Sequence, residues 1–246
     1  MSSSKVILVT GSNSGIGYEL VHLLAAKGHT VYLAARNETA GIDAVAKIKK
    51  EKNLDVKFVQ LDVTEIDSIE AAVAKIQKDE GRLNVLVNNA GISEFSTPQS
   101  AAKPNIASIR AAFEPNFYGM IQTTTAFLPV LRASSTPDAP SVILEVSTEM
   151  ASNTFMAGPD SFLHHAIPYN SSKAAANSYV IALARELRDE GIKVNTVTPG
   201  FTTTKLNGYL PGGKTPEQGA QALVEWCLLG KEGKTGQFAN DSGVWP

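Results

Sequence analysis

The stretch Val9-Thr10-Gly11-Ser12-Asn13-Ser14-Gly15-Ile16-Gly17 decides how this chain folds. It ends a β-branched apolar run and opens a helical pattern. Its glycines allow a tight turn, a close approach of the backbone to a pyrophosphate, and a bare helix N-terminus that favours an anion. The spacing, Gly-x-x-x-Gly-x-Gly, differs from the commoner Gly-x-Gly-x-x-Gly. A glycine-rich turn without a ligand is the alternative, but the strand before it and the helix after it favour a dinucleotide site.

Short β-branched runs alternate with helical patterns along the rest of the chain. Strands are expected at residues 5–10, 30–35, 56–61, 85–88, 141–146 and 193–198. Helices are expected near 15–27, 65–80, 107–132, 169–190 and 216–229. Several strands are nearly continuous apolar runs, as in parallel strands that are buried on both faces. The alternation predicts an α/β fold, a Rossmann-type doubly wound parallel sheet flanked by helices, in a single domain over 1–246.

Residues that could contact a ligand come directly after the expected strands. They are Gly11, Arg36, Asp62, Asn89, Thr148 and Pro199-Gly200, one for each strand in turn. Ligands of an open parallel sheet bind beyond the carboxyl ends of its strands, so one shared site is expected there. The segments 93–105 and 152–168 are expected to be inserted loops, and Gly158-Pro159-Asp160 in the second is a turn signal.

The end of the second expected strand indicates which nicotinamide cofactor would bind. An acidic residue at this point would accept hydrogen bonds from the adenosine ribose and repel a 2′-phosphate. This chain has Arg36-Asn37, with no acid until Glu38. A guanidinium matches a phosphate in charge and in fork geometry. The sequence therefore favours NADP(H) over NAD(H), with a solvated surface arginine as the alternative.

Tyr169 and Lys173 lie four residues apart in an expected helix. Positions i and i+4 share one face, so the phenol and the ammonium would lie side by side. An unperturbed tyrosine has a pKa of about 10, and a neighbouring positive charge lowers that pKa towards the range useful for proton transfer. The spacing alone is common by chance on surface helices. Together with the glycine motif upstream, it indicates an acid–base pair.

The composition is that of an ordinary globular chain. Of 246 residues, 43% are apolar and 19% charged, and the net charge of −2 gives no electrostatic basis for binding nucleic acid or an anionic membrane. Cys227 is the only cysteine, so no internal disulfide can form, which suits a reducing compartment. Met1-Ser2-Ser3-Ser4 leaves no room for a signal peptide, and no apolar run reaches the ~18 residues of a membrane span. We expect a soluble cytoplasmic protein.

These motifs resemble those of the short-chain dehydrogenase/reductase family over nearly the whole chain. The matching segments are 10–17, 61–63, 88–91, Asn116 within 114–117, 169–173 and 199–200. The segment 233–238 and Trp245 also resemble the monomeric carbonyl reductases of that family. The resemblance implies one NADP-binding domain with the family's fold and a carbonyl reductase-like activity.

The resemblance also implies roles for individual residues. Tyr169 would protonate a carbonyl oxygen, or act as the base in the reverse oxidation. Lys173 would hydrogen-bond the nicotinamide ribose and lower the pKa of Tyr169, and Asn116 would hold a water that completes a proton path. The cofactor would be contacted by Gly11, Ser12, Asn13, Ser14, Gly15, Ile16, Gly17, Arg36, Asn37, Asp62, Val63, Asn89, Ala90, Gly91, Tyr169, Lys173, Pro199, Gly200, Thr202 and Thr204. The hydride chemistry belongs to the cofactor, and the protein supplies orientation and the proton.

The end of the fifth expected strand departs from the family pattern. The family usually has a hydrophobic residue followed by Ser-Ser, with a glycine three residues after the catalytic serine. This chain reads Val146-Ser147-Thr148-Glu149-Met150-Ala151. Aligned on the strand, the catalytic hydroxyl falls on Thr148, and a slip of one residue would place it on Ser147. Threonine keeps a hydroxyl donor, but its methyl group narrows the pocket and restricts χ1.

The segment between Thr148 and Tyr169 is longer than is usual for the family. It contains Phe155, Met156, Phe162, Leu163, His164 and His165. Without a cysteine or an acidic cluster beside the histidines, no metal site is expected. Either the segment is a solvated loop or its apolar side chains line a substrate pocket. Glu149 is either a substrate contact or a surface carboxylate.

The sequence thus predicts an NADP(H)-dependent oxidoreductase that interconverts a ketone or aldehyde with an alcohol, with reduction favoured. Its partner would be a small carbonyl or alcohol substrate, with no nucleic acid and no membrane. Two alternatives are a family member recruited to a non-redox isomerisation or cyclisation, and an NADP-binding protein without catalysis. The oligomeric state stays open between a monomer and a homo-oligomer.

Overall fold

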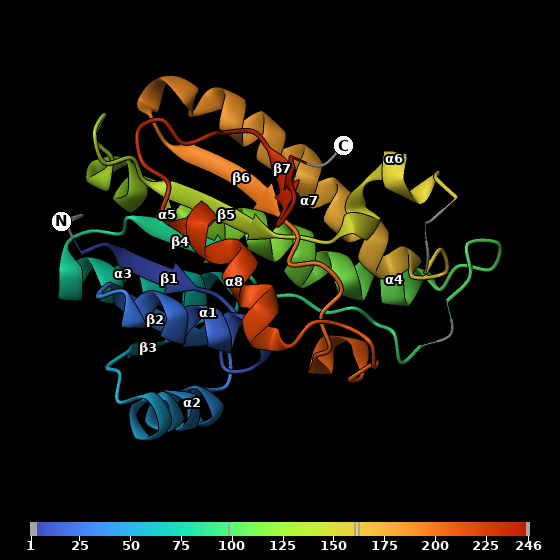
Figure 1. The fold of residues 1–246 in the computed structure, drawn as a ribbon, viewed down its shortest axis with the longest axis horizontal. Coiled ribbons are helices and arrows are strands. Elements are labelled where there is room, and N and C mark those ends of the chain that lie inside the picture. The colour runs from blue at the N-terminus through green and yellow to red at the C-terminus, as the bar shows by residue number, and fades with distance from the viewer. Residues whose placement is uncertain (1–3, 98, 160, 162, 245–246) are drawn as a thin grey trace.

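The computed structural model describes residues 4–97, 99–159, 161 and 163–244. Within these ranges, eight strands form one sheet in the order β3-β2-β1-β4-β5-β6-β7-β8 (Figure 1). They are β1 (Val6–Val9), β2 (Thr30–Ala35), β3 (Lys57–Gln60), β4 (Val85–Asn88), β5 (Val142–Val146), β6 (Lys193–Val197), β7 (Phe238–Asn240) and β8 (Gly243–Val244). All neighbours pair in parallel except β8, which is antiparallel to β7. Because the strand order reverses between β1 and β4, the loops after these two strands border a switch-point crevice.

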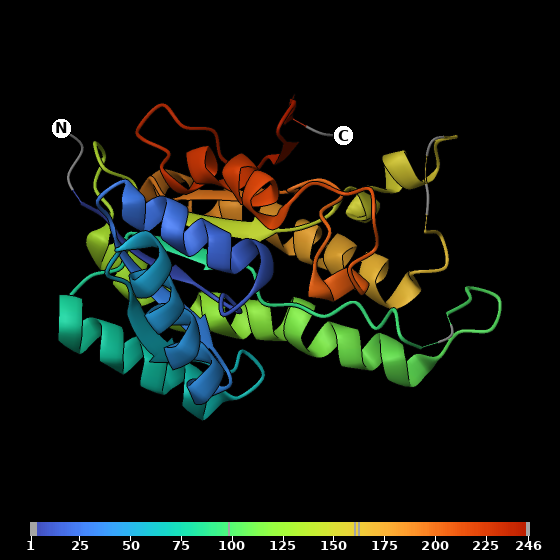
Figure 2. The same cartoon turned by 60° about the horizontal axis from the view of Figure 1, so that its bottom comes forward.

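Helices cover both faces of the sheet (Figures 1 and 2). They are α1 (Gly15–Ala26), α2 (Glu38–Lys52), α3 (Ile66–Glu80), α4 (Ile106–Phe113), α5 (Met120–Ser134), α6 (Asn153–Met156), α7 (Ile167–Glu186) and α8 (Pro216–Cys227). One face is covered by α1, α2 and α8, and the other by α3, α5 and α7. No helix in the described parts of the chain is long and apolar enough to cross a membrane.

Each face of the sheet packs on its own apolar core, because successive strand residues point to opposite faces. Ile7 and Val9 of β1 pack in the core that contains Leu20 and Leu24 of α1. Leu8, between them, packs in the core on the side of α3, α5 and α7. All five side chains are fully buried. Strands covered on both faces need apolar residues at nearly every position, which explains the continuous apolar runs of the sequence.

The predicted fold class, a single-domain Rossmann-type α/β sheet, is confirmed. All six predicted strands form, and their ends lie within about one residue of the predicted bounds. The helix α2 and the short strands β7 and β8 are absent from the sequence predictions. Helix α2 buries only Gly41, Ala44 and Ile48, so its apolar stripe is weak. Asn37 caps it by accepting a hydrogen bond from the backbone N–H of Ala40 at 2.8 Å.

The helix predicted over 107–132 forms, but it is not uniform. Helices α4 and α5 are joined without a break by the π-helical segment Glu114–Gly119, which carries Asn116. π-helical turns are rare in proteins overall, but those that occur often lie at functional sites. The predicted loop 152–168 contains the short helix α6, and α7 already begins at Ile167. Asp160, Phe162 and Trp245 lie outside the described residues.

Candidate active site

A cavity of about 1070 Å³ lies at the carboxyl ends of the strands. Of the predicted site residues, it is lined by Gly11, Asn13, Ser14, Gly15, Ile16, Gly17, Arg36, Asn37, Asp62, Val63, Asn89, Ala90, Gly91, Ser147, Tyr169, Lys173, Pro199 and Thr204. Most of these residues lie in the connections that follow β1 to β6. The parallel sheet therefore brings together residues that lie far apart in the sequence, as the strand-end pattern predicts.

The glycine loop after β1 leaves space over the N-terminus of α1, where the nearest side chain to Gly15 is that of Thr204. Gly11 has a φ of +59°, and a Cβ there would lie 2.7 Å from Cα of Ala90. A Cβ on Gly17 would lie 2.9 Å from Cα of Ser12. At Gly15, which lines the cavity, the nearest atom to such a Cβ is 3.8 Å away. The open cradle and the positive end of the α1 dipole suit a phosphate group.

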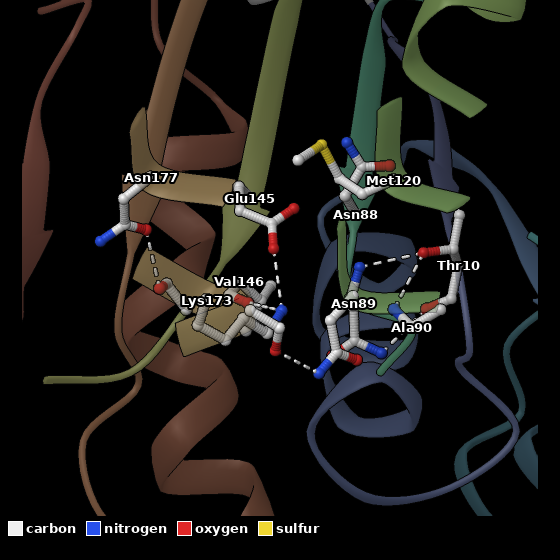
Figure 3. A network of polar contacts seen from close by, with 12 residues as sticks. Thr10, Asn88, Asn89, Ala90, Met120, Glu145, Val146, Lys173 and Asn177 are labelled. Atoms are coloured by element: carbon white, nitrogen blue, oxygen red, sulfur yellow. Dashed lines mark hydrogen bonds and ion pairs between the residues drawn. The ribbon is translucent and has the colours of Figure 1, made fainter. Parts of the chain in front are cut away.

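Thr10 and Asn89 hold the glycine loop against the loop that follows β4 (Figure 3). The side-chain amide of Asn89 donates to the carbonyl oxygens of Thr10 at 2.8 Å and Gly11 at 3.0 Å. In return, the Thr10 hydroxyl oxygen accepts from the backbone N–H groups of Asn89 and Ala90, both at 3.0 Å. Thr10 is not a predicted site residue, because its role depends on a neighbouring strand 77 residues further along the chain.

One cation that lines the larger cavity, Arg36, has no ionic partner among the described residues. Arg36 is exposed at the end of β2 and lines the cavity beside Asn37. Within the described ranges, its guanidinium takes part in no salt bridge. Asp62, on the next loop, accepts hydrogen bonds from the N–H and hydroxyl groups of Thr64 at 3.0 and 2.7 Å. Arg36 is thus available to an anionic group, whereas Asp62 is held in its own turn.

A second cavity of about 290 Å³ adjoins the first, and both are lined by Ile16, Phe95, Ser147, Tyr169, Pro199, Thr204, Leu206 and Asn207. Its other walls combine the apolar side chains of Met150, Leu163, Phe201 and Leu210 with polar side chains, among them Gln99, Glu149 and His165. Of the predicted site residues, Thr148, Gly200 and Thr202 line this cavity and not the larger one. From the loop before α7, Leu163 and His165 reach it, whereas Phe155, Met156 and His164 do not.

Tyr169 lies where the two cavities meet. Lys173 lines the larger cavity alone, Thr148 lines the smaller cavity alone, and Tyr169 lines both. Tyr169 is 8% exposed, and the ring of Phe95 packs edge-on against it with centroids 5.8 Å apart. The first turn of α7, with Pro168 next to Tyr169, fixes where the phenol enters the site. A group that faces both cavities can contact a cofactor and a substrate at once.

Lys173 is anchored to strand β5 by two hydrogen bonds. Its ammonium donates to Oε1 of Glu145 and to the carbonyl oxygen of Val146, both at 2.8 Å (Figure 3). Glu145 is 1% exposed and Lys173 2%, so this is a buried ion pair. Glu145 is not among the site residues predicted from the sequence. The available signal was a lone carboxylate within the apolar run of β5, Val142–Val146.

The pKa of Tyr169 depends on burial, on Lys173 and on two carboxylates, and the effect of Lys173 is outweighed. Burial raises the pKa of Tyr169, the Lys173 charge lowers it, and Glu145 and Glu149 raise it further. The predicted lowering by Lys173 is therefore present, but the net direction of the pKa shift of Tyr169 is upward, against the prediction that this pKa approaches the neutral range. Burial lowers the pKa of Lys173, but Glu145 and Tyr169 outweigh this and leave it raised. Burial raises the pKa of Glu145 to about 6 against the opposing effect of Lys173.

The two candidate hydroxyls at the end of β5 differ in their partners. Ser147 donates its hydroxyl to Oδ1 of Asn177 on α7 at 2.9 Å. The Thr148 oxygen accepts from the backbone N–H of Met150 at 3.3 Å. Across the residues that the structure describes, no acceptor takes the hydroxyl proton of Thr148. Thr148 can therefore donate into the smaller cavity without breaking a bond of the fold.

Two predicted site residues, Ser12 and Asn116, line neither cavity. The Ser12 hydroxyl donates to the carbonyl oxygen of Val9 at 2.7 Å and accepts from Ala34 N–H at 3.0 Å, so it ties the glycine loop to β1 and β2. Asn116 accepts from the N–H of Ile92 and donates to its carbonyl oxygen, both at 2.8 Å. Asn116 also donates to the hydroxyl oxygen of Ser172 on α7 at 3.0 Å, so it ties the loop after β4 to that helix. In this structure both residues hold parts of the fold together and do not line the cavities.

The chain is similar to known proteins over nearly its whole length. The family model for short chain dehydrogenase matches residues 5–213. Short-chain dehydrogenase anuI of Penicillium roqueforti is 33% identical over 230 residues, covering 92% of this chain and 89% of that protein. Salutaridine reductase of Papaver bracteatum is 28% identical, covering 97% of this chain and 94% of that protein. The solved structure of NADPH-bound carbonyl reductase from chicken fatty liver has a TM-score of 0.84 at 25% identity, covering 99% of this chain and 98% of that chain.

The matched region contains the glycine loop, Tyr169 and Lys173, and it extends over most of the chain. The sheet order and the helices on both faces agree with the solved relatives over nearly the full length. This chain belongs to the short-chain dehydrogenase/reductase family.

Proposed function

We propose that this chain is an NADP(H)-dependent reductase that converts a ketone or aldehyde to an alcohol, reversibly, with Tyr169 as the acid. Membership of the family makes it an oxidoreductase that acts on an alcohol or carbonyl group with a nicotinamide cofactor. The observation that carries the finer proposal is the position of Tyr169. It lies between a cavity that contains Lys173 and a cavity that contains Thr148.

The larger cavity fits a dinucleotide in shape and in charge. The glycine cradle at the start of α1 suits the pyrophosphate, and Ala90 and Gly91 offer backbone to the adenosine side. Arg36 provides an unpaired guanidinium where a 2′-phosphate of the adenosine ribose would lie, which favours NADP(H). The chicken carbonyl reductase, solved with NADPH bound, supports the same choice.

A bound nicotinamide supplies or accepts the hydride. The residues of this chain handle the proton and the charge on oxygen. The Tyr169 hydroxyl donates its proton to the carbonyl oxygen, while the Thr148 hydroxyl donates a hydrogen bond to the same oxygen and stabilises its developing negative charge. Lys173 uses two of its three N–H donors on β5, and the third is available to the cofactor side of the site. In the reverse direction, Tyr169 takes the proton from the alcohol.

The smaller cavity favours an apolar substrate. Most of its exposed wall is apolar, with Phe95, Met150, Leu163 and Phe201 among the lining residues, although polar side chains such as Gln99 and Thr202 line it as well. Glu149 also lines it, so a hydrogen-bond donor on the substrate would find one acceptor there. An apolar body with a carbonyl group beside Tyr169 is therefore the class of substrate that fits best.

The direct test measures NADPH consumption by the purified chain with a panel of apolar ketones and aldehydes. We expect turnover with some of them, and loss of turnover with retained NADPH binding in Tyr169→Phe. A product that forms without cofactor consumption would support a non-redox reaction. NADPH binding without turnover across the panel, together with no alcohol oxidation, would support a binding protein without catalysis.

A further inference from the structure

Glu145 is a buried carboxylate with one partner. It lies in the middle of the apolar run of β5, and its Oε1 accepts from Lys173 at 2.8 Å. Its other oxygen, Oε2, is buried and has no hydrogen-bond partner among the described residues. Burying a charge in this way costs free energy that an ion pair only partly returns. An apolar side chain would fill the same place in the strand without that cost, so the carboxylate needs a reason beyond packing.

Glu145 first of all limits where the Lys173 ammonium can lie. Two of its three N–H donors point to β5, one to Glu145 and one to the Val146 carbonyl oxygen. The third donor remains for the larger cavity, which Lys173 lines. A lysine side chain is flexible, and this pair of bonds selects one of its many conformers.

Glu145 also changes the charge that Tyr169 experiences. The charged groups that act on Tyr169 are Lys173 on the same helix, Glu145 on β5, and Glu149 on the turn after β5. His165 lines the same smaller cavity, but it is exposed. Lys173 alone would favour the phenolate, whereas the two carboxylates favour the neutral phenol. Within the buried pair, one negative charge lies against the one positive charge that could stabilise the phenolate.

We propose that Glu145 positions Lys173 and offsets its charge, so that Tyr169 stays in the protonated form that gives a proton to a carbonyl oxygen. The inference rests on the proposed role of Tyr169 and adds a residue to it. Glu145 does not alter the equilibrium of the reaction. It would set the pH range in which each direction is fast, because reduction needs the phenol of Tyr169 and oxidation needs the phenolate.

The test is Glu145→Gln, which keeps the shape and an oxygen acceptor for Lys173 but removes the charge. We expect Tyr169 to ionise at lower pH, and alcohol oxidation near neutral pH to rise about tenfold for each unit by which the pKa falls. Ionisation is followed by the ultraviolet absorbance of phenolate without cofactor. The chain has six tyrosines, so the signal of Tyr169 is taken as the difference from the same protein carrying Tyr169→Phe. Glu145→Asp, which keeps the charge, should retain the wild-type profile.

A double variant, Glu145→Gln with Lys173→Met, covers the case in which the single variant does not fold. It replaces the pair by two neutral side chains of similar volume. If Glu145 offsets Lys173, Tyr169 should ionise in the double variant near the wild-type pH. Ionisation at a clearly higher pH than in the wild type would show that Lys173 dominates, and this would overturn the proposal.

An unchanged Tyr169 titration in folded Glu145→Gln would also overturn it and leave Glu145 a purely structural role. The titration needs no substrate, so it separates this inference from the proposed function. If the wild type reduces no carbonyl while the titration shifts as expected, the charge relationship stands and the reductase assignment fails.

Discussion

The Ser147 hydroxyl donates to the side-chain oxygen of Asn177, 2.9 Å away, across the contact between β5 and α7. Both side chains are buried. A hydroxyl has a single proton, so this bond leaves Ser147 no donor for a substrate oxygen. Thr148, the next residue, faces the smaller cavity with its proton uncommitted among the described residues. Thr148, although it is not a serine, is therefore the better placed of the two hydroxyls.

We expect Thr148→Ala to lower kcat by about 10²–10³-fold, because loss of one donor to a developing oxyanion typically has an effect of this size. Thr148→Ser should keep most of the activity. Ser147→Ala should instead lower the free energy of unfolding by about 1 kcal/mol, since it removes a buried hydrogen bond, with a milder effect on kcat. Steady-state kinetics and thermal unfolding of the three variants check this. The opposite ranking of kcat would assign the catalytic hydroxyl to Ser147.

Arg36 should decide between the two nicotinamide cofactors. Arg36→Ala removes a charge-assisted contact worth about 1.5–3 kcal/mol, so the Kd for NADPH should rise about 10- to 100-fold while the Kd for NADH changes little. Arg36→Asp should additionally favour NADH. Lys52→Ala, an exposed lysine at the distant end of α2, is the matched control for loss of one positive charge. Equal affinity of the wild type for NADPH and NADH, measured by calorimetry, would contradict this prediction.

Gly11 should be intolerant of a side chain for two separate reasons. Its φ is +59°, and a Cβ there would lie 2.7 Å from Cα of Ala90. Gly28 also has a positive φ, of +85°, but nothing lies within 4 Å of a Cβ at that position. Gly28→Ala should lower the free energy of unfolding by only about 1–2 kcal/mol, the cost of the left-handed conformation. Gly11→Ala should destabilise the protein more and also weaken NADPH binding. Equal losses in denaturant titrations would show that the contact with Ala90 does not matter.

The strands could be predicted from the sequence because strands buried on both faces need apolar residues at nearly every position. The runs in β1, β4 and β5 show this pattern. The position of the site followed from the same reasoning, since parallel strands place their carboxyl ends along one edge. Helix α2 could not be recognised because only three of its residues are buried, and one of them is a glycine. The π-helical turn at Glu114–Gly119 has no periodicity that a helix pattern would show.

The electrostatics of the site depend on contacts that no spacing reveals. Tyr169 and Lys173 are four residues apart, and that pair was predicted. Glu145 lies 28 residues before Lys173 on a different element, and only the packing of α7 against β5 brings the two charges together. The sign of the pKa shift of Tyr169 therefore could not be obtained from the helix alone. The only local sign of this contact in the sequence was a charged residue, Glu145, within the apolar run of β5.

The pH dependence of the two directions should differ. The folded pKa of Tyr169 lies above its ordinary value of 10.0, so the phenol is protonated throughout the neutral range. Carbonyl reduction, which uses the phenol, should be nearly independent of pH until the solution becomes strongly alkaline. Alcohol oxidation, which uses the phenolate, should rise about tenfold per pH unit towards that pKa. Measuring kcat in both directions across pH checks this. An oxidation rate that levels off near neutral pH would show a lowered pKa instead.

Tyr169→Phe tests the chemistry with the least change to the fold. The variant removes one oxygen, and no hydrogen bond from that hydroxyl supports the described part of the structure. The edge-on contact with Phe95, at 5.8 Å, should survive because it uses the ring alone. Unfolding and NADPH affinity should therefore change little. Loss of the general acid should lower kcat by about 10²–10⁴-fold, and loss of oriented hydrogen bonding to the alkoxide should lower it further.

Lys173→Ala is the contrasting variant, because it removes a partner on which the fold depends. Glu145 would be left buried and unpaired, which should lower the free energy of unfolding by about 3–5 kcal/mol, and cofactor binding and turnover should fall together. Lys173→Ala should impair cofactor binding and turnover together. Tyr169→Phe should impair turnover alone, since it removes the proton donor and leaves cofactor binding intact. The decisive measurement is carbonyl reduction by folded Tyr169→Phe with NADPH affinity determined in parallel. Near-normal turnover would mean that another group supplies the proton, and the assignment of Tyr169 as the acid would then fail.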